Sequence, residues 1–407
     1  MRKLLQISIE INSGSVGRIA EQIGEVAISH GWESYITYAR NNNPSKSHMI
    51  KIGSKWDVYW HGLMTRIFDD HALHSKQATR NLIKTIHSIQ PDIIQLHHIH
   101  GYYINMEILF NYLSSLKIPI VWIFHDCWSM TGHCAHFDYV HCEKWKTGCY
   151  KCEQKNSYPA SLIFDRSKKN YFLKKELFNS IDDLTIVPVS YWLEGIVKES
   201  FLKNNRIRVI QNGIDLSIFS PQNSINKIRS KYNIDKKIIL LGVASTWNSK
   251  KGLSDFFNLN SIIDSETRII LVGLTKKQIN KLPFGIIGIE RTENVQQLAE
   301  LYSAADAFIN PTWEDTFPTT NLEALACGTP VITYRTGGSV ESVSTETGFV
   351  VEKGDIEAVW ESVKLIKEKG RDYYHITCRQ MAENLYNKKD KFEEYIQLYS
   401  ELLNLKK

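Results

Sequence analysis

The chain has 407 residues, of which 43% are hydrophobic and 23% charged, proportions that are ordinary for a soluble globular protein of two or three domains. Its net charge of +5 is too small and too dispersed to indicate a nucleic-acid-binding protein, although it permits weak attraction to anionic lipid headgroups. The apolar run near the N-terminus is interrupted by Gln6 and Glu10, which predicts a first strand rather than a signal peptide. No apolar run approaches the roughly 20 residues of a membrane span, so we expect a cytoplasmic protein.

The first 40 residues have the pattern of a strand, a glycine-containing turn and a helix. We predict a buried strand over residues 4–11 and a following helix on which Ile19 and Ile23 recur at helical spacing. Gly14 and Gly17 lie in the turn, where a backbone without side chains can approach a phosphate or a sugar closely. This pattern opens a doubly wound α/β unit. It is not a dinucleotide-binding fingerprint, because a third glycine is absent, and a plain turn is the alternative interpretation.

Two stretches of the N-terminal half are predicted to lie at the surface. Residues 41–59 are polar and irregular, which predicts a long loop of the kind that often meets a substrate, and an ordinary surface insertion is the alternative. Residues 168–178 mix basic and apolar side chains. They predict a helix that either covers the core or lies on an anionic membrane, and we favour the first interpretation.

Histidines follow two predicted buried strands of this half, over residues 91–96 and 120–124. The first strand is followed by His97, His98, His100 and Tyr102, and the second by His125 and Asp126. Ligands of α/β enzymes bind at the carboxyl ends of parallel strands, so we assign His100 and Tyr102 to acceptor binding. A zinc site built from the first three histidines is the alternative. Their spacing disfavours it, because neighbouring side chains point to opposite faces.

Five of the seven cysteines fall within a short insertion over residues 127–152. The Cys149–Cys152 spacing is that of a zinc knuckle, and Cys134 and Cys142 can complete a four-sulfur site, so we predict a structural zinc ion. Free thiols and a redox pair at Cys149 and Cys152 are the alternatives. We do not expect a zinc ribbon that binds nucleic acid.

A second doubly wound unit is predicted in the C-terminal half. Its first strand covers residues 238–243 and precedes Lys250, Lys251 and Gly252, which open a helix. Further strands are predicted over residues 268–272, 286–289, 307–310 and 331–334. Glu290 directly follows one of them, where it can meet a nucleobase.

The segment 311–333 carries the most specific pattern of the chain. Pro318 predicts the start of a helix that stops at Gly328, and the free N–H groups of such a start form an anion site. Asp315 and Glu323 flank this site. Carboxylates repel phosphate but accept hydrogen bonds from sugar hydroxyls, so the segment predicts a nucleotide-sugar site. A capped surface helix is the alternative, but it does not explain both acids.

This segment resembles the signature of family 4 of the glycosyltransferases, which are retaining enzymes of the two-domain GT-B fold. The resemblance implies that Asp315 contacts the transferred sugar and Glu323 the ribose. The family usually has Glu at the first position, so neighbouring Glu314 is an alternative for the working acid. The family's Phe-Gly-Leu is replaced by Phe317, Pro318 and Thr319. With Thr320, these three residues are the expected donor-binding segment.

The resemblance extends to most of the chain. It implies that Lys251 binds the diphosphate and that His125 lies near the transferred sugar. The family's Arg falls at Thr246 or Trp247, so this cation is missing, and either Lys250 replaces it or the indole stacks on the ligand. The resemblance further assigns Gly14 and Gly17 to the glycine loop of the N-terminal domain, Asn212 to the interdomain hinge, and the tail to a helix that returns to the N-terminal domain.

We therefore predict a GT-B α/β protein with an N-terminal acceptor domain (1–205), a nucleotide-sugar domain (206–388) and a returning helix (389–407). The expected activity is retaining transfer of a hexose from a nucleotide diphosphate sugar, preferably a UDP-sugar, to a lipid-linked oligosaccharide. The resemblance implies that catalysis needs no metal and permits contact with the inner membrane. The alternatives are a UDP-sugar 2-epimerase of the same fold and a non-catalytic scaffold of a polysaccharide assembly complex.

Overall fold

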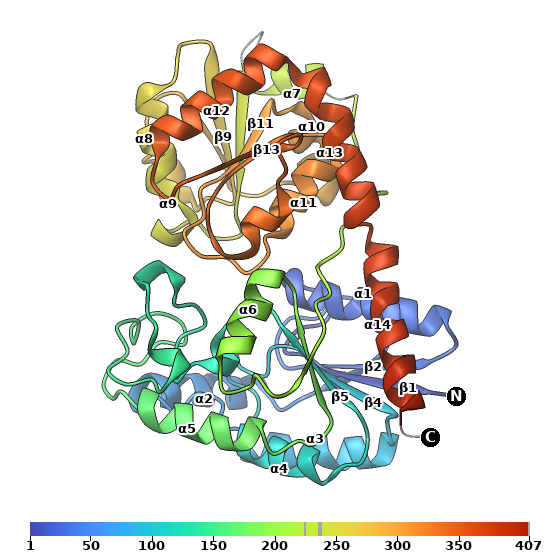
Figure 1. Cartoon of the computed structure of the whole chain (residues 1–407). Coiled ribbons are helices and arrows are strands. Elements are labelled where there is room, and N and C mark those ends of the chain that lie inside the picture. Colours follow the sequence, from blue (N-terminus) through green and yellow to red (C-terminus); the bar gives the residue numbers. More distant parts are fainter. Residues whose placement is uncertain (224, 235–237, 406–407) are drawn as a thin grey trace. The chain divides into compact units, whose positions relative to one another are not determined.

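The computed structural model describes residues 1–223, 225–234 and 238–405 (Figure 1). It divides into two compact units, of which the first contains residues 1–211 and those from 391 onward, and the second residues 212–390. The predicted divisions fall after residues 205 and 388, and residues 406–407 of the predicted tail lie outside the described part. Each unit is built on a sheet whose strands are all parallel, with seven strands in the first and six in the second. The two predicted α/β domains are thus confirmed.

The sheet of the N-terminal unit has the order β3-β2-β1-β4-β5-β6-β7. Its strands are β1 (Lys3–Ile7), β2 (Glu33–Tyr38), β3 (His48–Lys51), β4 (Ile93–Leu96), β5 (Ile120–Phe124), β6 (Leu184–Pro188) and β7 (Arg206–Ile207). Its helices are α1 (Gly14–Ser29), α2 (Lys55–Phe68), α3 (Lys76–Ile89), α4 (Met106–Ser115), α5 (Ser167–Phe178), α6 (Tyr191–Glu199) and the 3-10 turns η1 (Trp128–Met130), η2 (Asp138–Val140) and η3 (Lys144–Lys146). Strands β4, β5 and β6 are buried along their whole length, as expected for a parallel sheet covered on both faces.

The crossing direction of the connections determines which face each helix covers. The α1 connection leads from β1 to β2, whereas the α3, α4 and α5 connections lead toward the opposite edge of the sheet. Because such crossovers are right-handed, α1 lies on one face, and α3, α4 and α5 pack side by side on the other (Figure 1). The connections that follow β1 and β4 therefore leave the carboxyl ends of these strands in opposite directions.

The last helix, α14 (Lys388–Asn404), returns to the N-terminal unit, where its described residues from 391 onward belong. The Tyr399 ring lies 5.7 Å from that of Trp32, and Glu393 pairs with His30 at 2.9 Å. The Tyr399 hydroxyl donates to Oε1 of Gln95, which lies on β4 in the centre of the sheet. The helix is therefore part of the core of this unit.

The sheet of the C-terminal unit has the order β10-β9-β8-β11-β12-β13. Its strands are β8 (Ile238–Val243), β9 (Thr267–Val272), β10 (Ile286–Ile289), β11 (Ala307–Asn310), β12 (Val331–Tyr334) and β13 (Gly348–Val351). Its helices are α7 (Ile225–Lys231), η4 (Ser249–Lys251), α8 (Leu253–Ile262), α9 (Lys276–Ile279), α10 (Val295–Ala304), α11 (Thr319–Ala326), η5 (Gly337–Ser342), α12 (Ile356–Lys369) and α13 (Arg371–Leu385). Helix α8 packs against α12, and α10 packs against α7 and α11.

Two predictions about the N-terminal elements are wrong. Residues 41–59 are not one long loop, because they contain β3 and the start of α2. The helix begins with a capping box in which Ser54 accepts from the backbone of Asp57 and the Asp57 carboxylate accepts from that of Ser54. The first strand ends at Ile7 rather than at Ile11, which forms an isolated bridge with Asn42.

The favoured prediction for residues 168–178 is confirmed. Helix α5 buries Tyr171, Leu177 and Phe178 in its own unit, so its apolar face covers the core. None of the helices in the described part of the chain combines the length and the apolar character that a membrane-crossing helix needs.

The buried contact between α14 and β4 yields a stability prediction. In Tyr399→Phe, Oε1 of Gln95 loses its donor inside the core, so we expect the free energy of unfolding to fall by about 1–3 kcal/mol. The control is Tyr373→Phe, at a half-exposed position of α13, which should change stability by less than about 0.5 kcal/mol. Urea denaturation, with hydrogen exchange at β4 as the local probe, measures both. Equal stability of the two variants would contradict the prediction.

Candidate functional site

The order of strands places two loops of the C-terminal unit next to each other. Strand β8 has β9 on one side and β11 on the other, so the connections after β8 and after β11 leave the sheet in opposite directions. Such a switch point is where open α/β sheets bind their ligands. The loop after β8 carries Lys250 and Lys251 in η4, and the loop after β11 carries Glu314 and Asp315 before α11.

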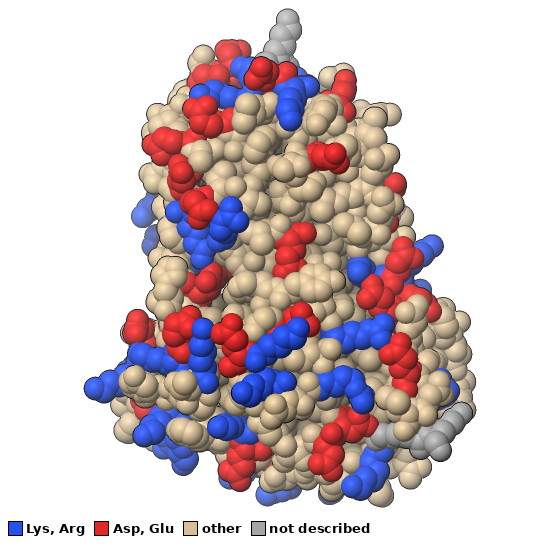
Figure 2. Space-filling model, viewed as in Figure 1, with Lys and Arg blue, Asp and Glu red and all other residues tan. Residues whose placement is uncertain are grey.

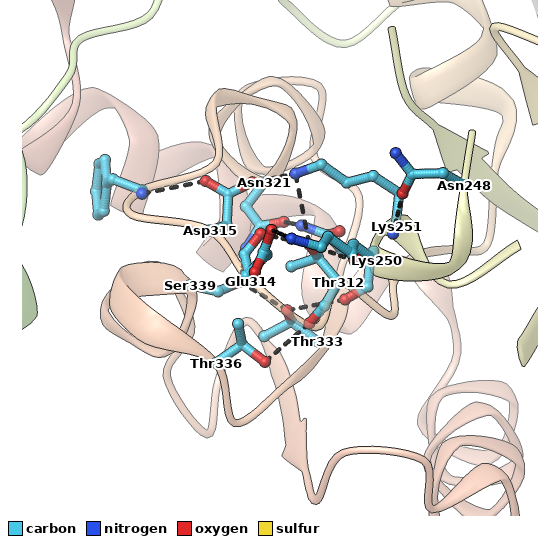
Figure 3. Close-up of polar contacts among 12 residues, drawn as sticks. Asn248, Lys250, Lys251, Thr312, Glu314, Asp315, Asn321, Thr333, Thr336 and Ser339 are labelled. Atoms are coloured by element: carbon cyan, nitrogen blue, oxygen red, sulfur yellow. Dashed lines mark hydrogen bonds and ion pairs between the residues drawn. The ribbon is translucent and has the colours of Figure 1, made fainter. Parts of the chain in front are cut away.

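The side chains of these two loops form two lysine–carboxylate pairs (Figure 3). Lys250 Nζ lies 2.6 Å from Oε1 of Glu314, and Lys251 Nζ lies 2.7 Å from Oδ2 of Asp315. In the first pair, the side chain of Glu314 is only 8% exposed, whereas in the second pair that of Lys251 is 36% exposed. The first pair is therefore the more deeply buried. Asp315 and Glu314, the two alternatives for the working acid, therefore both lie in the site, each beside its own lysine.

Backbone contacts hold the two loops in this register. The N–H of Trp313 donates to the carbonyl of Lys250 at 2.8 Å, and the Asn248 side chain caps η4 by accepting from the N–H of Lys251 at 3.1 Å. Gly252 has a φ of +73°, and a Cβ there would lie 2.3 Å from the carbonyl oxygen of Pro311. Only glycine combines this backbone conformation with so close an approach.

Buried polar side chains fix the start of α11. Asn321 is fully buried, accepts from Asn310 at 2.8 Å and donates to Ser339 and Ser342 at 3.0 and 2.9 Å. Figure 3 shows Asn321 and Ser339 beside the lysine–carboxylate pairs. Pro318 is the N-cap of the helix rather than its first residue, so the predicted start is one residue too early. Half-buried Thr319 and Thr320 form the first positions of α11, and Oδ1 of Asp315 accepts from the N–H of Phe317 at 3.3 Å. Phe317 itself is buried.

Glu323 lies one turn along α11 and accepts from the hydroxyl of Tyr302 at 2.8 Å. This tyrosine, which the sequence analysis missed, is buried and orients the carboxylate; burial and the charge of Glu323 both raise the Tyr302 pKa. Asn212 is buried and its amide group donates to the carbonyl of Phe317 at 3.5 Å. Glu290 is exposed directly after edge strand β10, and no contact brings it to the lysine–carboxylate pairs.

The predicted ligand stacking on Trp247 is wrong. Its indole is 5% exposed, donates to the carbonyl of Val272 at 2.8 Å and packs edge-on against Phe256. The side chain is part of the core beneath the site. Lys250 is therefore the cation that stands beside Lys251.

In the N-terminal unit, the predicted glycine loop belongs to α1. Gly14 begins the helix with a φ of +61°, and Gly17 lies one turn later. A Cβ on Gly17 would lie 3.1 Å from the backbone carbonyl of Glu10. The two glycines thus let α1 start directly against the loop that follows β1.

A chain of hydrogen bonds leads from the core to His125. Nε2 of His97 lies 3.0 Å from Oε1 of Gln6, and Nδ1 of His97 lies 3.2 Å from Nε2 of His125. Nε2 of His97 also lies 3.1 Å from the amide nitrogen of Gln95, so this ring is held between two glutamines of the core and His125. Burial lowers the His97 pKa to about 3 and holds the His125 pKa well below its ordinary value. Both rings are therefore neutral at pH 7.

The other histidines of this edge face Asp126 rather than His97. Nε2 of His100 lies 2.8 Å and Nε2 of His98 lies 3.3 Å from Oδ2 of Asp126. Burial alone would raise the Asp126 pKa, but the two histidines outweigh it and hold this pKa well below its ordinary value. Within the described residues, these three side chains form the one group whose metal-ligand atoms gather within 4.8 Å. The alternative that joins His97 to this set is wrong, because His97 points to Gln6.

His100 and Tyr102, the predicted acceptor-binding residues, are both 6% exposed. Nδ1 of His100 lies 3.1 Å from the hydroxyl of Tyr158. The Tyr102 ring lies between the guanidinium groups of Arg40 and Arg66, at 5.4 and 5.6 Å from its centroid. Their part in acceptor binding stays a prediction.

The cysteine-rich insertion packs around aromatic side chains and a buried lysine. The ring of Phe137 stacks on Trp145 at 4.8 Å, and Lys174 of α5 donates to the carbonyls of Trp128 and Thr131 at 2.7 and 3.0 Å. Burial lowers the Lys174 pKa to about 7. These contacts order a stretch that lacks a sequence period.

Two of the four predicted zinc ligands adjoin each other. The thiol of Cys134 hydrogen-bonds to the sulfur of Cys152, which lowers the Cys152 pKa to about 7. Cys149 accepts from the N–H of Gly132 at 3.1 Å, and burial raises its pKa to about 11. Cys142 is half-buried. Among the described residues, the four cysteines do not form a group with their sulfur atoms gathered closely enough to hold a metal ion, so the zinc ion stays a prediction.

Two parallel α/β units, with paired charges at a switch point before a helix, define a GT-B glycosyltransferase. Models of two protein families match the chain, "Glycosyltransferase Family 4" over residues 16–218 and "Glycosyl transferases group 1" over residues 235–368. The chain belongs to glycosyltransferase family 4, the group 1 glycosyltransferases. The resemblance seen in segment 311–333 is thus confirmed.

Individual relatives match the chain at lower identity. The putative colanic acid biosynthesis glycosyl transferase WcaC of Escherichia coli is 24% identical over 98% of this chain and 100% of its own length. The capsular polysaccharide biosynthesis glycosyltransferase CapM of Staphylococcus aureus is 27% identical over 51% of this chain and 59% of its own.

Solved structures share the fold. Sucrose-phosphate synthase from Thermosynechococcus elongatus matches with a TM-score of 0.73 at 16% identity, covering 100% of both chains. Anabaena HepE in complex with UDP and glucose matches with a TM-score of 0.69 at 14% identity, covering 98% of this chain and 100% of its own.

The neutral histidine chain yields a pH prediction. His97 is buried with a pKa of about 3, whereas an unfolded histidine titrates near 6.5, so between these values the unfolded chain binds the extra proton. The free energy of unfolding should therefore fall as the pH is lowered from about 6.5, by roughly 2 kcal/mol for such a histidine at about pH 5. In His97→Gln this decline should be smaller by about that amount.

Urea denaturation over a series of pH values measures the decline. The control is His87→Gln, at an exposed position of α3, which should keep the wild-type pH profile. Parallel profiles for wild type and His97→Gln would contradict the neutral state of the buried ring.

Proposed function

We propose that this glycosyltransferase moves a hexose from a UDP-sugar to a lipid-linked oligosaccharide in the synthesis of a bacterial surface polysaccharide, with retention of configuration. The observation that carries the proposal is the pairing of Lys250 with Glu314 and of Lys251 with Asp315, directly before the start of α11. Cations for a diphosphate and acceptors for sugar hydroxyls lie there within one group of side chains.

The donor would bind by an exchange of partners. Each lysine is neutralised by a carboxylate, and a diphosphate with its larger charge competes for both lysines. The carboxylates are then released to accept from sugar hydroxyls. Glu323, oriented by Tyr302, is placed one turn further along α11 to accept from the ribose hydroxyls. The free N–H groups at Thr319 and Thr320 add the positive end of the helix dipole.

Glu314 is the better candidate for the sugar-binding acid. Both oxygens of Asp315 are used, one by Lys251 and the other by the N–H of Phe317. Among the described residues, none bonds to the buried Oε2 atom of Glu314. A sugar hydroxyl that donates to this oxygen would satisfy it.

The reaction would proceed on one face of the sugar. The bond between the anomeric carbon and the diphosphate oxygen breaks, the acceptor hydroxyl oxygen bonds to the same face, and its proton passes to the departing phosphate. Lys250, Lys251 and the start of α11 stabilise the charge that grows on the diphosphate, and no metal is required. His125, which is neutral at pH 7, would contact a hydroxyl of the transferred sugar rather than protonate the leaving group.

The relatives support the acceptor class. Besides WcaC and CapM, an N-acetylgalactosaminyltransferase of Campylobacter jejuni that acts on N,N'-diacetylbacillosaminyl-diphospho-undecaprenol is 24% identical over 50% of this chain and 56% of its own. Its acceptor is a sugar on a lipid diphosphate. Acceptor binding at His100 and Tyr102 and nucleobase contact at Glu290 are parts of this proposal.

Donor binding and turnover test the proposal on separate residues. A nucleotide sugar at about a hundred times its dissociation constant should add about 2.7 kcal/mol to the free energy of unfolding, visible as a thermal shift with UDP ligands. In Glu323→Gln the loss of charged hydrogen bonds to the ribose should weaken UDP binding about tenfold to a hundredfold. In Lys251→Ala turnover should fall by about two to three orders of magnitude.

The matched control is Lys281→Ala, a lysine of the same unit after α9. It should leave both binding and turnover unchanged. Acceptor-dependent release of UDP separates transfer from 2-epimerisation, which needs no acceptor. If no nucleotide shifts the melting temperature, and Glu323→Gln keeps the cellular phenotype, the scaffold alternative replaces the proposal.

Glu314→Gln and Asp315→Asn assign the sugar-binding acid. We expect Glu314→Gln to weaken binding of the UDP-sugar more than binding of UDP. The reason is that Oε2 of Glu314 would contact the sugar but not the nucleotide. Asp315→Asn should weaken both ligands to a similar degree through Lys251 and the loop before α11. Calorimetric titration with UDP and with the UDP-sugar measures the difference. Equal effects of Glu314→Gln on the two ligands would contradict the assignment.

We also propose that Cys134, Cys142, Cys149 and Cys152 hold a structural zinc ion. The hydrogen bond between Cys134 and Cys152 and the low pKa of Cys152 support it, because zinc binds the thiolate. Elemental analysis of reduced, purified protein should find about one zinc per chain, and less in Cys152→Ser. The control Cys378→Ala lies in the other unit and should keep the metal. Reduced protein without zinc would remove the proposal.

A further inference from the structure

Helix α2 exposes the stripe of side chains that a helix normally buries. Trp56, Tyr59, Trp60 and Leu63 recur at spacings of three and four residues, so they share one face. Their exposed fractions are 79%, 67%, 58% and 38%. The opposite face, which packs on the unit, consists of His61, Gly62 and Thr65. The helix is therefore amphipathic, with its apolar side outward.

A neighbouring segment extends this surface. Leu162, Ile163 and Phe164 are 68%, 61% and 48% exposed. The N–H of Leu162 donates to the carbonyl of Arg66 at 2.7 Å, and the ring of Phe164 stacks on Phe68 at 5.8 Å. These contacts join the segment to the last turn of α2. We call the seven exposed side chains the apolar ridge: Trp56, Tyr59, Trp60, Leu63, Leu162, Ile163 and Phe164.

Positive charge borders the apolar ridge. Lys55 and Arg66 are exposed on α2, Nζ of Lys155 donates to the carbonyl of Ile163 at 3.2 Å, and Arg166 is 39% exposed beside Phe68. Next along the chain, α3 exposes three further basic residues at spacings of four and contains no acid: Lys76, Arg80 and Lys84. Lys and Arg also gather over the N-terminal unit on the face drawn in Figure 2, with acidic side chains interspersed.

The acids at the apolar ridge are engaged by the backbone. Asp57 accepts from the N–H and hydroxyl of Ser54 in the capping box. Asp165 accepts from the N–H groups of Ser167 and Cys152. Arg166 also lies 3.9 Å from Oδ2 of Asp70, so three acids stand against four basic residues, which leaves the border of the ridge with a charge of about +1.

We propose that the apolar ridge docks this protein on an anionic membrane surface. Tryptophan and tyrosine favour the headgroup level of a bilayer, where the ring is buried and the polar atom stays hydrated, and leucine, isoleucine and phenylalanine reach the acyl boundary. The basic border matches the negative charge of the cytoplasmic leaflet. The proposal rests on the proposed function for its purpose, since a lipid-linked acceptor is held at such a surface.

Cosedimentation with vesicles tests the docking. The full chain should bind vesicles that contain about one third phosphatidylglycerol in phosphatidylcholine, and bind pure phosphatidylcholine less. Higher salt should weaken binding, because it screens the border charges. In Trp56→Ser/Trp60→Ser the partition coefficient should fall about tenfold or more. In Lys155→Gln/Arg166→Gln the preference for phosphatidylglycerol should decrease while binding to phosphatidylcholine remains.

The matched control is Phe284→Ser, which removes a 96% exposed aromatic ring from the C-terminal unit. It should bind vesicles as wild type does. The UDP thermal shift of the tryptophan variant should also equal that of wild type, which shows that the fold and the donor site persist. If wild type itself shows no thermal shift with UDP, the proposed function is contradicted, whereas the vesicle result still tests the docking proposal.

Two outcomes would overturn the docking proposal. One is equal vesicle binding by wild type and the tryptophan variant, or no binding by wild type at low salt. The other is seen in light scattering, if wild type has the mass of a dimer, the tryptophan variant has that of a monomer, and neither binds vesicles. That result would assign the apolar ridge to contact with a second copy of the chain.

Discussion

The charges of the candidate site depend on two parallel strands, β8 and β11, that end side by side while their connections diverge. This order brings Lys250 and Lys251 from one loop against Glu314 and Asp315 from another, more than 60 positions later in the chain. The buried amide and hydroxyl groups around Asn321 then fix where α11 begins. These groups are buried and mutually bonded, so they hold the helix start in place.

The N-terminal unit uses burial in a different way at its own strand ends. His97 and His125 are desolvated and neutral, joined to Gln6 in the core, whereas His98 and His100 share the charge of Asp126. The histidines at these strand ends thus differ in their partners, because His97 and His125 bond toward the core whereas His98 and His100 face a carboxylate. A neutral imidazole at His125 fits a reaction in which the leaving diphosphate takes the proton.

The architecture and the acids of segment 311–333 could be predicted, because buried strands, a proline and spaced carboxylates are local signals. The pairing of each acid with its own lysine could not, since it arises from the strand order. Helix α2 was missed because its apolar stripe, Trp56 to Leu63, is mixed with polar residues and faces outward, although the Ser54 and Asp57 capping box was readable. Trp247 was misassigned because sequence position gives no burial.

The two departures from the family pattern belong together. The chain lacks the family's Arg, and it has Asp315 where a longer acid is usual, but it adds Lys250 and Glu314 as a second pair. The candidate site therefore contains two cations and an acid with the reach of Glu, and each cation is compensated by a carboxylate. Since burying an uncompensated charge is costly, the buried carboxylate of Glu314 needs a cation beside it in this arrangement. Replacement of Lys250 alone is then a larger change than replacement of both residues, because it leaves the buried charge of Glu314 without this cation.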